Sequence, residues 1–277
     1  IDFAASAPYD PIDMHPENPM QKLDAIMFSP HKFLGGPGSP GVLIFDASIY
    51  HNEVPDQPGG GTVDWTNPWG EYKYVDNIEA REDGGTPGFL QSIKAALCFQ
   101  LKQQMGCDNI RKREEELLQR AFAGLDTIPG LHILADNMRN RLGVISFYID
   151  GIHYNLLVRL LNDLFGLQVR GGCACAGTYG HFLLEVSYEK SREITSKINH
   201  GDLSEKPGWV RWSLHPTTTN AEIDLMICGL THIAANITQL REEYIYDNHH
   251  NLYWHKNDTR SGYGEIMQKW FTLEDEN

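Results

Sequence analysis

The sequence has few cysteines and no long apolar run. Five cysteines in 277 residues are an odd, sparse set, which excludes a disulfide framework and is typical of reduced thiols. No stretch of about 18 apolar residues occurs, so a transmembrane helix is not expected. The first residues lack the basic start and apolar core of a signal peptide. These absences together predict a cytoplasmic protein.

Positive charge is also scarce. Lysine and arginine total 23 against 37 acidic residues, which gives a formal net charge of −14. This balance argues against nucleic acid or an anionic membrane as the main partner, although a local basic site for a small anion stays open. The length and the 41% hydrophobic content are sufficient for one large domain or two modest ones.

Apolar runs separated by turn residues divide the chain into short strands and helices. The pattern predicts strands at residues 24–28, 41–45, 131–135, 142–149 and 208–214, and a short strand that ends at Val169. It predicts helices at residues 89–105, 108–125 and 153–165, one helix within 180–198, and one from the Thr219 and Glu222 capping pair to about residue 245. Residues 52–88 are predicted to be irregular, which at this length is usually functional.

The order of these elements predicts an α/β protein with two units. Residues 1–125 are expected to form part of a large cofactor-binding domain with linking helices, built on a parallel or mixed sheet. Residues 126–246 are expected to form a smaller α/β domain of βαβ character. Residues 247–277 form a polar extension with scattered aromatic residues, either a tail or a docked segment.

The segment SPHKFLGGPGSPG, residues 29–41, carries the strongest chemical signal. Lys32 follows a predicted buried strand, and open α/β sheets bind ligands at the carboxyl ends of their strands. A partly desolvated lysine there would be an amine nucleophile suited to a Schiff base. Ser29 and His31 flank the lysine and could bond a phosphate. The plainer alternative is a surface lysine in a glycine-rich turn.

This segment is similar to the Ser-x-His-Lys-x-x-Gly-Pro-x-Gly signature of class V aminotransferases and cysteine desulfurases. The resemblance implies a fold type I enzyme whose Lys32 carries pyridoxal 5'-phosphate, with Ser29 and His31 at the cofactor phosphate. It further implies that Asp2, which precedes Lys32 by 30 residues, holds the pyridine nitrogen protonated. Ala5 stands where the family often has glutamine. The family's first phosphate-binding loop is not in this sequence, so a fragment that is inactive in isolation is expected.

Two glycine-rich loops resemble family loops that reach a neighbouring subunit. The first is Gly59-Gly60-Gly61-Thr62, and the second contains Gly84-Gly85-Thr86. Glycines expose backbone amides that can bind an anion. The resemblance therefore implies that Gly60 and Thr86 contact cofactor phosphate and that the protein is a homodimer. Each loop by itself is also compatible with a plain turn.

The segment VRGGCACAG, residues 169–177, resembles the desulfurase stretch Arg-x-Gly-x-x-Cys-Ala. Cys175 stands five residues after Arg170, and the resemblance implies that it attacks the substrate sulfur. The alternatives are a pair of inert loop thiols or a Cys-x-Cys metal pair, which no other cysteine pair completes. The strand WVRWSL resembles the family's Val-Arg-x-Ser, which implies that Arg211 binds the substrate carboxylate with help from Arg170.

These motifs predict a pyridoxal-phosphate-dependent lyase of the cysteine desulfurase type, which releases sulfur from cysteine or a related amino acid through a cysteine persulfide. The expected partners are an amino acid substrate, a second subunit and a sulfur-acceptor protein. Two alternatives stay open. One is a class V aminotransferase, epimerase or other lyase in which Cys175 is a bystander. The other is a non-catalytic chain that keeps the fold. No metal is expected.

Overall fold

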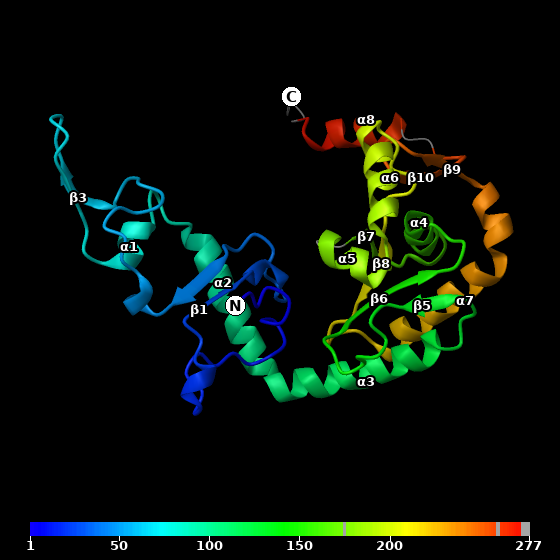
Figure 1. Cartoon of the computed structure of the whole chain (residues 1–277), viewed down its shortest axis with the longest axis horizontal. Helices are drawn as coiled ribbons and strands as arrows, with labels where there is room; N and C mark the ends of the chain where they lie inside the picture. The colour runs from blue at the N-terminus through cyan, green and yellow to red at the C-terminus, as the bar shows by residue number, and fades with distance from the viewer. Residues whose placement is uncertain (174–175, 259–260, 273–277) are drawn as a thin grey trace, which may run out of the picture. The chain divides into compact units, whose positions relative to one another are not determined.

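A computed structural model describes residues 1–173, 176–258 and 261–272 (Figure 1). The chain divides into two compact units, Ile1–Arg113 and Glu114–Asn277. The division falls within helix α3, Cys107–Leu125. The functional domains expected at residues 1–125, 126–246 and 247–277 stay a prediction.

The first unit is built around short strands. Strand β1, Ala25–Phe28, pairs antiparallel with β2, Val42–Phe45, and Asp2 forms a parallel bridge with Met27. The strand pairing in this unit is therefore both parallel and antiparallel, which fits the parallel or mixed sheet expected from the sequence. The rest of the unit holds a hairpin of β3, Val63–Thr66, and β4, Tyr72–Tyr74, a short helix α1, Ile78–Glu82, and the 3₁₀ turns η1, Pro19–Gln21, η2, Pro30–Lys32, and η3, Ala47–Ile49.

The prediction that residues 52–88 are irregular is wrong. The β3–β4 turn is organised by Asn67, whose side-chain oxygen accepts from the amides of Trp69 and Glu71 at 3.1 and 3.0 Å. Gly70 follows at φ 89°, a backbone conformation that glycine adopts without strain. The two strands are only four and three residues long and are mostly exposed, so their alternation of apolar and polar residues is too short for a sequence pattern to stand out.

Helix α2, Phe89–Met105, occupies the predicted range. Its buried residues are Ala95 and Cys98, and Cys98 joins Ala7 and Phe33 in a small core. An apolar stripe at helical spacing is largely exposed: Leu90, Ile93 and Leu97 are 79%, 57% and 59% accessible. The stripe is therefore an uncovered surface of this unit and does not contribute to its core.

The second unit contains a four-stranded sheet in the order β5-β6-β8-β7. Its strands are β5, Leu131–Ile133, β6, Val144–Ile149, β7, Arg170–Gly172, and β8, Trp209–Ser213. Strands β6 and β7 both run antiparallel to β8, so they are parallel to each other and are joined through helix α4, Tyr154–Phe165. This is a split βαβ unit. The short strand expected to end at Val169 instead begins one residue later.

One face of this sheet carries the main core. Alternate residues of β6 and β8, among them Phe147 and Val210, are fully buried against α3, α4 and α7, Asn220–Glu242. Helix α4 begins at the His153 cap and contributes Leu156, Leu157 and two further leucines that are completely buried. Removing a buried aromatic ring such as Phe147 from a core of this kind costs about 3–5 kcal/mol.

Among the described residues, α7 is the one helix long and apolar enough to cross a membrane by length and composition. Its Ile223, Leu230 and Ile233 are instead completely buried in the core of the second unit. The helix begins with a capping box between Thr219 and Glu222. A core helix meets the same composition test as a membrane span, and the packing assigns α7 to the core.

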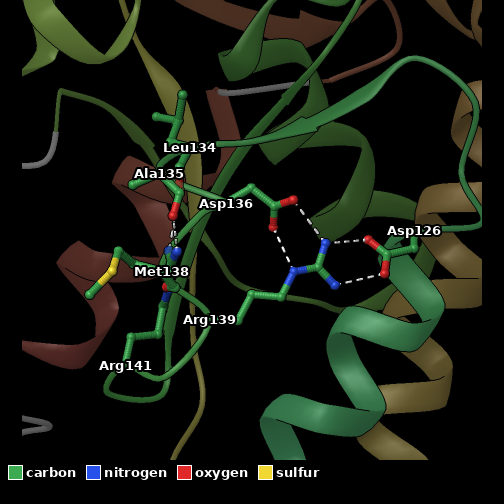
Figure 2. A network of polar contacts seen from close by, with 7 residues as sticks. All are labelled: Asp126, Leu134, Ala135, Asp136, Met138, Arg139 and Arg141. Atoms are coloured by element: carbon green, nitrogen blue, oxygen red, sulfur yellow. Dashed lines mark hydrogen bonds and ion pairs between the residues drawn. The ribbon is translucent and has the colours of Figure 1, made fainter.

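The connection between β5 and β6 is held by a polar network (Figure 2). The Arg139 guanidinium donates to both oxygens of Asp126 at 2.7 and 2.9 Å and to Asp136 at 2.8 Å. It also lies 4.8 Å from the centroid of the Phe122 ring. Arg141 donates to the carbonyl groups of Leu134, Ala135 and Met138. These contacts tie an irregular segment to the end of α3.

The prediction of one helix within residues 180–198 is corrected to two, α5, Gly177–Leu183, and α6, Tyr188–Asn199. Glu185 at φ 51° interrupts the helical path, and Ser187 caps α6. The residues after α7 form a hairpin of β9, Tyr244–Asp247, and β10, Leu252–His255, followed by α8, Ser261–Trp270. Because β10 packs on α4, the hairpin part of the predicted extension is docked on the second unit.

Candidate active site

Lys32 ends the 3₁₀ turn η2, which follows β1 directly. Buried Pro30 and Phe33 flank the turn, and the Phe33 ring packs against Phe99 at a centroid distance of 5.3 Å. The loop then folds back, and a Cβ at Gly36 would lie 1.9 Å from the carbonyl oxygen of Pro30. Only glycine fits there, so the sequence of this segment determines where the Lys32 amine is presented.

Asp2 lies beside the strand that leads to Lys32. The amide of Phe3 donates to the Met27 carbonyl at 2.8 Å, and the amide of Met27 donates to the Ile1 carbonyl at 3.0 Å. The Asp2 carboxylate accepts from the Ala4 amide at 2.7 Å and is otherwise exposed. Asp2 thus forms a bridge beside β1, the strand that precedes the turn with Lys32.

Exposure in this unit differs from the sequence expectation. Lys32 and His31 are both exposed and Ser29 is half-buried, so the described residues of the first unit do not desolvate the lysine. The hydroxyl of Ser39 in the same loop is buried and has no hydrogen-bond partner among the described residues. The exposed carboxylate of Asp2, the exposed amine of Lys32 and the buried hydroxyl of Ser39 fit a ligand that carries both a basic ring nitrogen and an electrophilic carbonyl.

The two glycine loops predicted separately meet in the structure. The Gly85 amide donates to the Gly60 carbonyl at 2.8 Å, and a Cβ at Gly59 would lie 3.1 Å from Gly84 Cα. The Thr62 hydroxyl donates to the Gly59 carbonyl at 2.6 Å. Thr86 remains exposed. The loops form one glycine-lined surface, while the phosphate contacts assigned to Gly60 and Thr86 stay predictions.

A set of side-chain contacts next to these loops was not predicted from the sequence. The Tyr50 hydroxyl donates to Glu82, which also accepts from the Asp56 amide at 3.1 Å and raises the pKa of the tyrosine. The Arg81 guanidinium lies 5.4 Å from the Tyr50 ring centroid and donates to the Val75 carbonyl at 3.2 Å. These partners are distant in sequence and carry no motif, so no local signal could have revealed them.

The second unit brings the two predicted substrate arginines together. Arg170 on β7 lies directly opposite Arg211 on β8, and Ser146 on β6 lies opposite Arg211 on its other side. Directly opposite residues project from the same face of a sheet. Because Val210 and Trp212 belong to the core, Arg211 belongs to the other face.

Two buried donors on that face have no partner in the part of the chain that the structure describes. The Nε of Arg211 and the Nε1 of Trp209 are buried and unpaired among the described residues. Trp209 stands two positions before Arg211, so strand alternation places it on the same face, and this signal could have revealed it from the sequence. Unsatisfied buried donors are rare and indicate an acceptor that joins them, which suits a carboxylate.

The thiol segment begins where β7 ends. The Cys173 sulfur is half-buried and donates to the Pro207 carbonyl at 2.9 Å. Cys175, the predicted nucleophile, lies outside the described residues. Within the described ranges no group of three His, Cys, Asp or Glu side chains forms a metal-binding cluster. Of the remaining predicted residues, Asp2 and Lys32 belong to the first unit, and Arg170 and Arg211 belong to the second.

Comparison with known proteins identifies the family. The family model "Aminotransferase class-V" matches residues 1–226. A probable cysteine desulfurase of Staphylococcus epidermidis is 32% identical over 178 residues, and one of Staphylococcus aureus is 30% identical over 176 residues. Each match covers 64% of this chain and 41% of the relative, so the chain spans about two-fifths of these relatives.

Solved structures agree on the fold. A cysteine desulfurase from Thermococcus onnurineus has a TM-score of 0.63 at 24% identity, over 85% of this chain and 52% of that one. The cysteine desulfurase CsdA from Escherichia coli has a TM-score of 0.62 at 19% identity, over 85% and 51%. The predicted fold type I architecture is confirmed. The chain belongs to the class V aminotransferase family of pyridoxal-phosphate enzymes.

Proposed function

We propose that the protein is a pyridoxal-phosphate-dependent lyase of the cysteine desulfurase type, acting on cysteine or a related amino acid. The observation that carries the proposal is the pairing of Arg170 with Arg211 across β7 and β8. This pairing joins a binding site for a carboxylate to the strand that leads directly into Cys173. The relatives named as probable cysteine desulfurases support it.

The first unit supplies the residues for the cofactor. Lys32 would hold pyridoxal phosphate covalently, Asp2 would pair with its ring nitrogen, and Ser29 and His31 would contact its phosphate. When bound, the cofactor withdraws electrons from the substrate Cα. The open Asp2 carboxylate and the accessible Lys32 amine fit these roles.

The chain's own side chains then divide the work. Arg211 and Arg170 orient the substrate by its carboxylate, since a planar guanidinium binds that anion through two hydrogen bonds. The Lys32 amine accepts the Cα proton as a general base. The Cys175 thiolate forms an S–S bond with the substrate sulfur while the C–S bond breaks and its electron pair stays with carbon. Cys175 then carries the sulfur as a persulfide, which a thiol acceptor can reduce.

The decisive experiment compares the two loop thiols in the full-length protein loaded with pyridoxal phosphate. We expect Cys175→Ala to abolish sulfide release from cysteine in the presence of a thiol reductant and to leave the cofactor absorbance intact. Cys173→Ala, the matched control, should keep most of the activity, because its sulfur is engaged with Pro207. Near-normal sulfide release by Cys175→Ala, or transamination without any release of sulfur, would favour the aminotransferase, epimerase or other-lyase alternative.

The proposal includes a homodimer in the cytoplasm, with a separate sulfur-acceptor protein. Thr86 is exposed on the glycine-lined surface, where a second subunit could use it for a phosphate contact. Sedimentation of the cofactor-loaded protein tests the dimer, and a loaded monomer would contradict it. A non-catalytic chain would show no cofactor absorbance at all.

A further inference from the structure

One residue of the C-terminal hairpin turn, Asn251, is buried, although hairpin turns are usually exposed. Asn251 is only 8% accessible and adopts φ 55°, a conformation that asparagine tolerates better than most residues. Its side-chain amide donates to the Tyr154 hydroxyl at 2.7 Å, and its side-chain oxygen accepts from Tyr246 at 3.0 Å. Its backbone carbonyl accepts from Asn155 at 2.5 Å. Every polar group of the Asn251 side chain thus has a partner.

The two residues bonded to Asn251, Tyr154 and Asn155, contact strand β7, which precedes Cys173. Tyr154 and Asn155 begin helix α4. A Cβ at Gly171 would lie 2.5 Å from the Asn155 side-chain oxygen, and a Cβ at Gly208 would lie 2.6 Å from the Tyr154 ring. The same Cβ at Gly208 would lie 2.9 Å from Gly172 Cα. Strand β7 is therefore in close contact with the two side chains that the turn fixes.

The same turn also holds the other side of the thiol segment. The Leu203 amide donates to the Asn248 carbonyl at 2.8 Å, and His249 Nδ1 lies 2.8 Å from the Gly201 carbonyl oxygen. Both contacts anchor the segment of residues 201–207. That segment ends at Pro207, whose carbonyl accepts from the Cys173 thiol. One turn thus supports both β7, which leads into Cys173, and the carbonyl to which Cys173 is bonded.

We propose that the turn Asn248–Asn251 positions Cys173, with Asn251 as the positioning residue. The catalytic consequence rests on the proposed function, because it requires Cys175, two residues further along the chain, to receive sulfur. The turn lies beyond residue 226, where the match to the family model ends.

The test uses the full-length, cofactor-loaded protein and three variants. Asn251→Gly removes the two side-chain hydrogen bonds and keeps both the left-handed backbone and the carbonyl bonded to Asn155. Tyr154→Phe removes only the hydroxyl and keeps the ring beside Gly208, so it tests the same contact if Asn251→Gly does not fold. His250→Ala is the control, because this side chain is on the same turn, is 72% accessible and bonds to Asp247.

Two readouts separate positioning from general stability. We expect Asn251→Gly and Tyr154→Phe to lower kcat for sulfide release about tenfold, with KM for cysteine changed less than about twofold, because Arg211 stays in place on β8. In a Cys175→Ala background, alkylation of Cys173 by iodoacetamide should accelerate about tenfold in both variants, since the buried hydrogen bond between Asn251 and Tyr154 no longer holds its surroundings. Alkylation of exposed Cys228 should not change.

The outcomes are distinct. If both variants behave like His250→Ala in kcat and in Cys173 alkylation, the turn does not position the thiol segment. Equal acceleration at Cys173 and at buried Cys98 would show general loosening and would also overturn the inference. A wild-type protein that releases no sulfide refutes the proposed function alone, and the alkylation rates still decide whether the turn positions Cys173.

Discussion

His153 makes the stability of the second unit sensitive to mild acid. Its Nδ1 accepts from the Asn155 amide at 3.1 Å and caps α4, while its Nε2 is buried without a partner among the described residues. The ring lies 4.4 Å from the Tyr154 ring and 5.4 Å from those of Tyr246 and Tyr253. Burial among these aromatic rings disfavours the imidazolium and lowers the pKa of His153 to about 4.

The sign and size of the stability change follow from the difference between the pKa values of His153 in the folded and unfolded chain. An unfolded histidine titrates near about 6.5, so between pH 6.5 and pH 4 the unfolded chain binds a proton that folded His153 does not. Stability is therefore unaffected by this group above about pH 6.5 and falls as the pH drops through the window. At pH 4.5 the loss is ~2 kcal/mol, after a reduction for the partial exposure of the ring.

The measurement compares the pH-dependent change in unfolding free energy of wild type with that of a variant without the titrating group. His153→Asn keeps a good capping side chain and removes the titrating group. Urea unfolding followed by the fluorescence of buried Trp209 and Trp212 gives the free energy of unfolding at pH 7 and pH 4.5. Wild type should lose ~2 kcal/mol more than His153→Asn over this interval. The control His232→Asn changes an exposed histidine of α7 and should behave like wild type. Equal losses in wild type and His153→Asn would refute the assignment.

Three further results are expected. Borohydride reduction and peptide mass analysis should place the pyridoxyl label on Lys32. A label on another lysine would contradict the assignment of Lys32 as the cofactor-binding lysine. Thr219→Ala should cost about 1 kcal/mol of unfolding free energy because the capping box of α7 is lost, whereas Thr219→Ser should cost less. Lys102→Met should weaken binding of pyridoxal phosphate about tenfold in a fluorescence titration, because the Lys102 amine anchors the carbonyl groups of Ala7 and Asp10 near Asp2; unchanged affinity would contradict this role.

The elements predicted well are those whose sequence carries two agreeing signals. Helix α2 occupies the predicted residues 89–105, and α7 begins at the predicted Thr219 cap. Elements with a short or single sequence signal were predicted incorrectly. The strands of the β3–β4 hairpin are too short for their alternation to stand out, and the break between α5 and α6 depends on the left-handed Glu185 and the Ser187 cap. A search of the sequence for periodic apolar residues detects neither feature.

The candidate site was predictable as a set of residues and not as an arrangement. Motifs selected Lys32, Arg170 and Arg211, but only the β7–β8 register shows that the two arginines are directly opposite. The buried donor of Trp209 was available from strand alternation and was overlooked. The role of Asn251 had no local signal, because its partners Tyr154 and Asn155 are nearly one hundred residues away.

In each unit a polar side chain from a distant position, half-buried Lys102 or buried Asn251, makes hydrogen bonds that hold a segment next to predicted site residues. In the first unit, Lys102 donates to backbone carbonyls in the turn after Asp2, and its burial lowers the pKa of the amine. In the second unit, Asn251 holds the start of α4 against the strand that leads to Cys173. A buried polar group left without its partner costs more than the hydrogen bond itself contributes, so such a contact favours a single arrangement of its neighbours. Apolar packing alone tolerates many arrangements of similar volume. This difference explains why polar contacts, rather than the leucine-rich core, set the position of the predicted site residues.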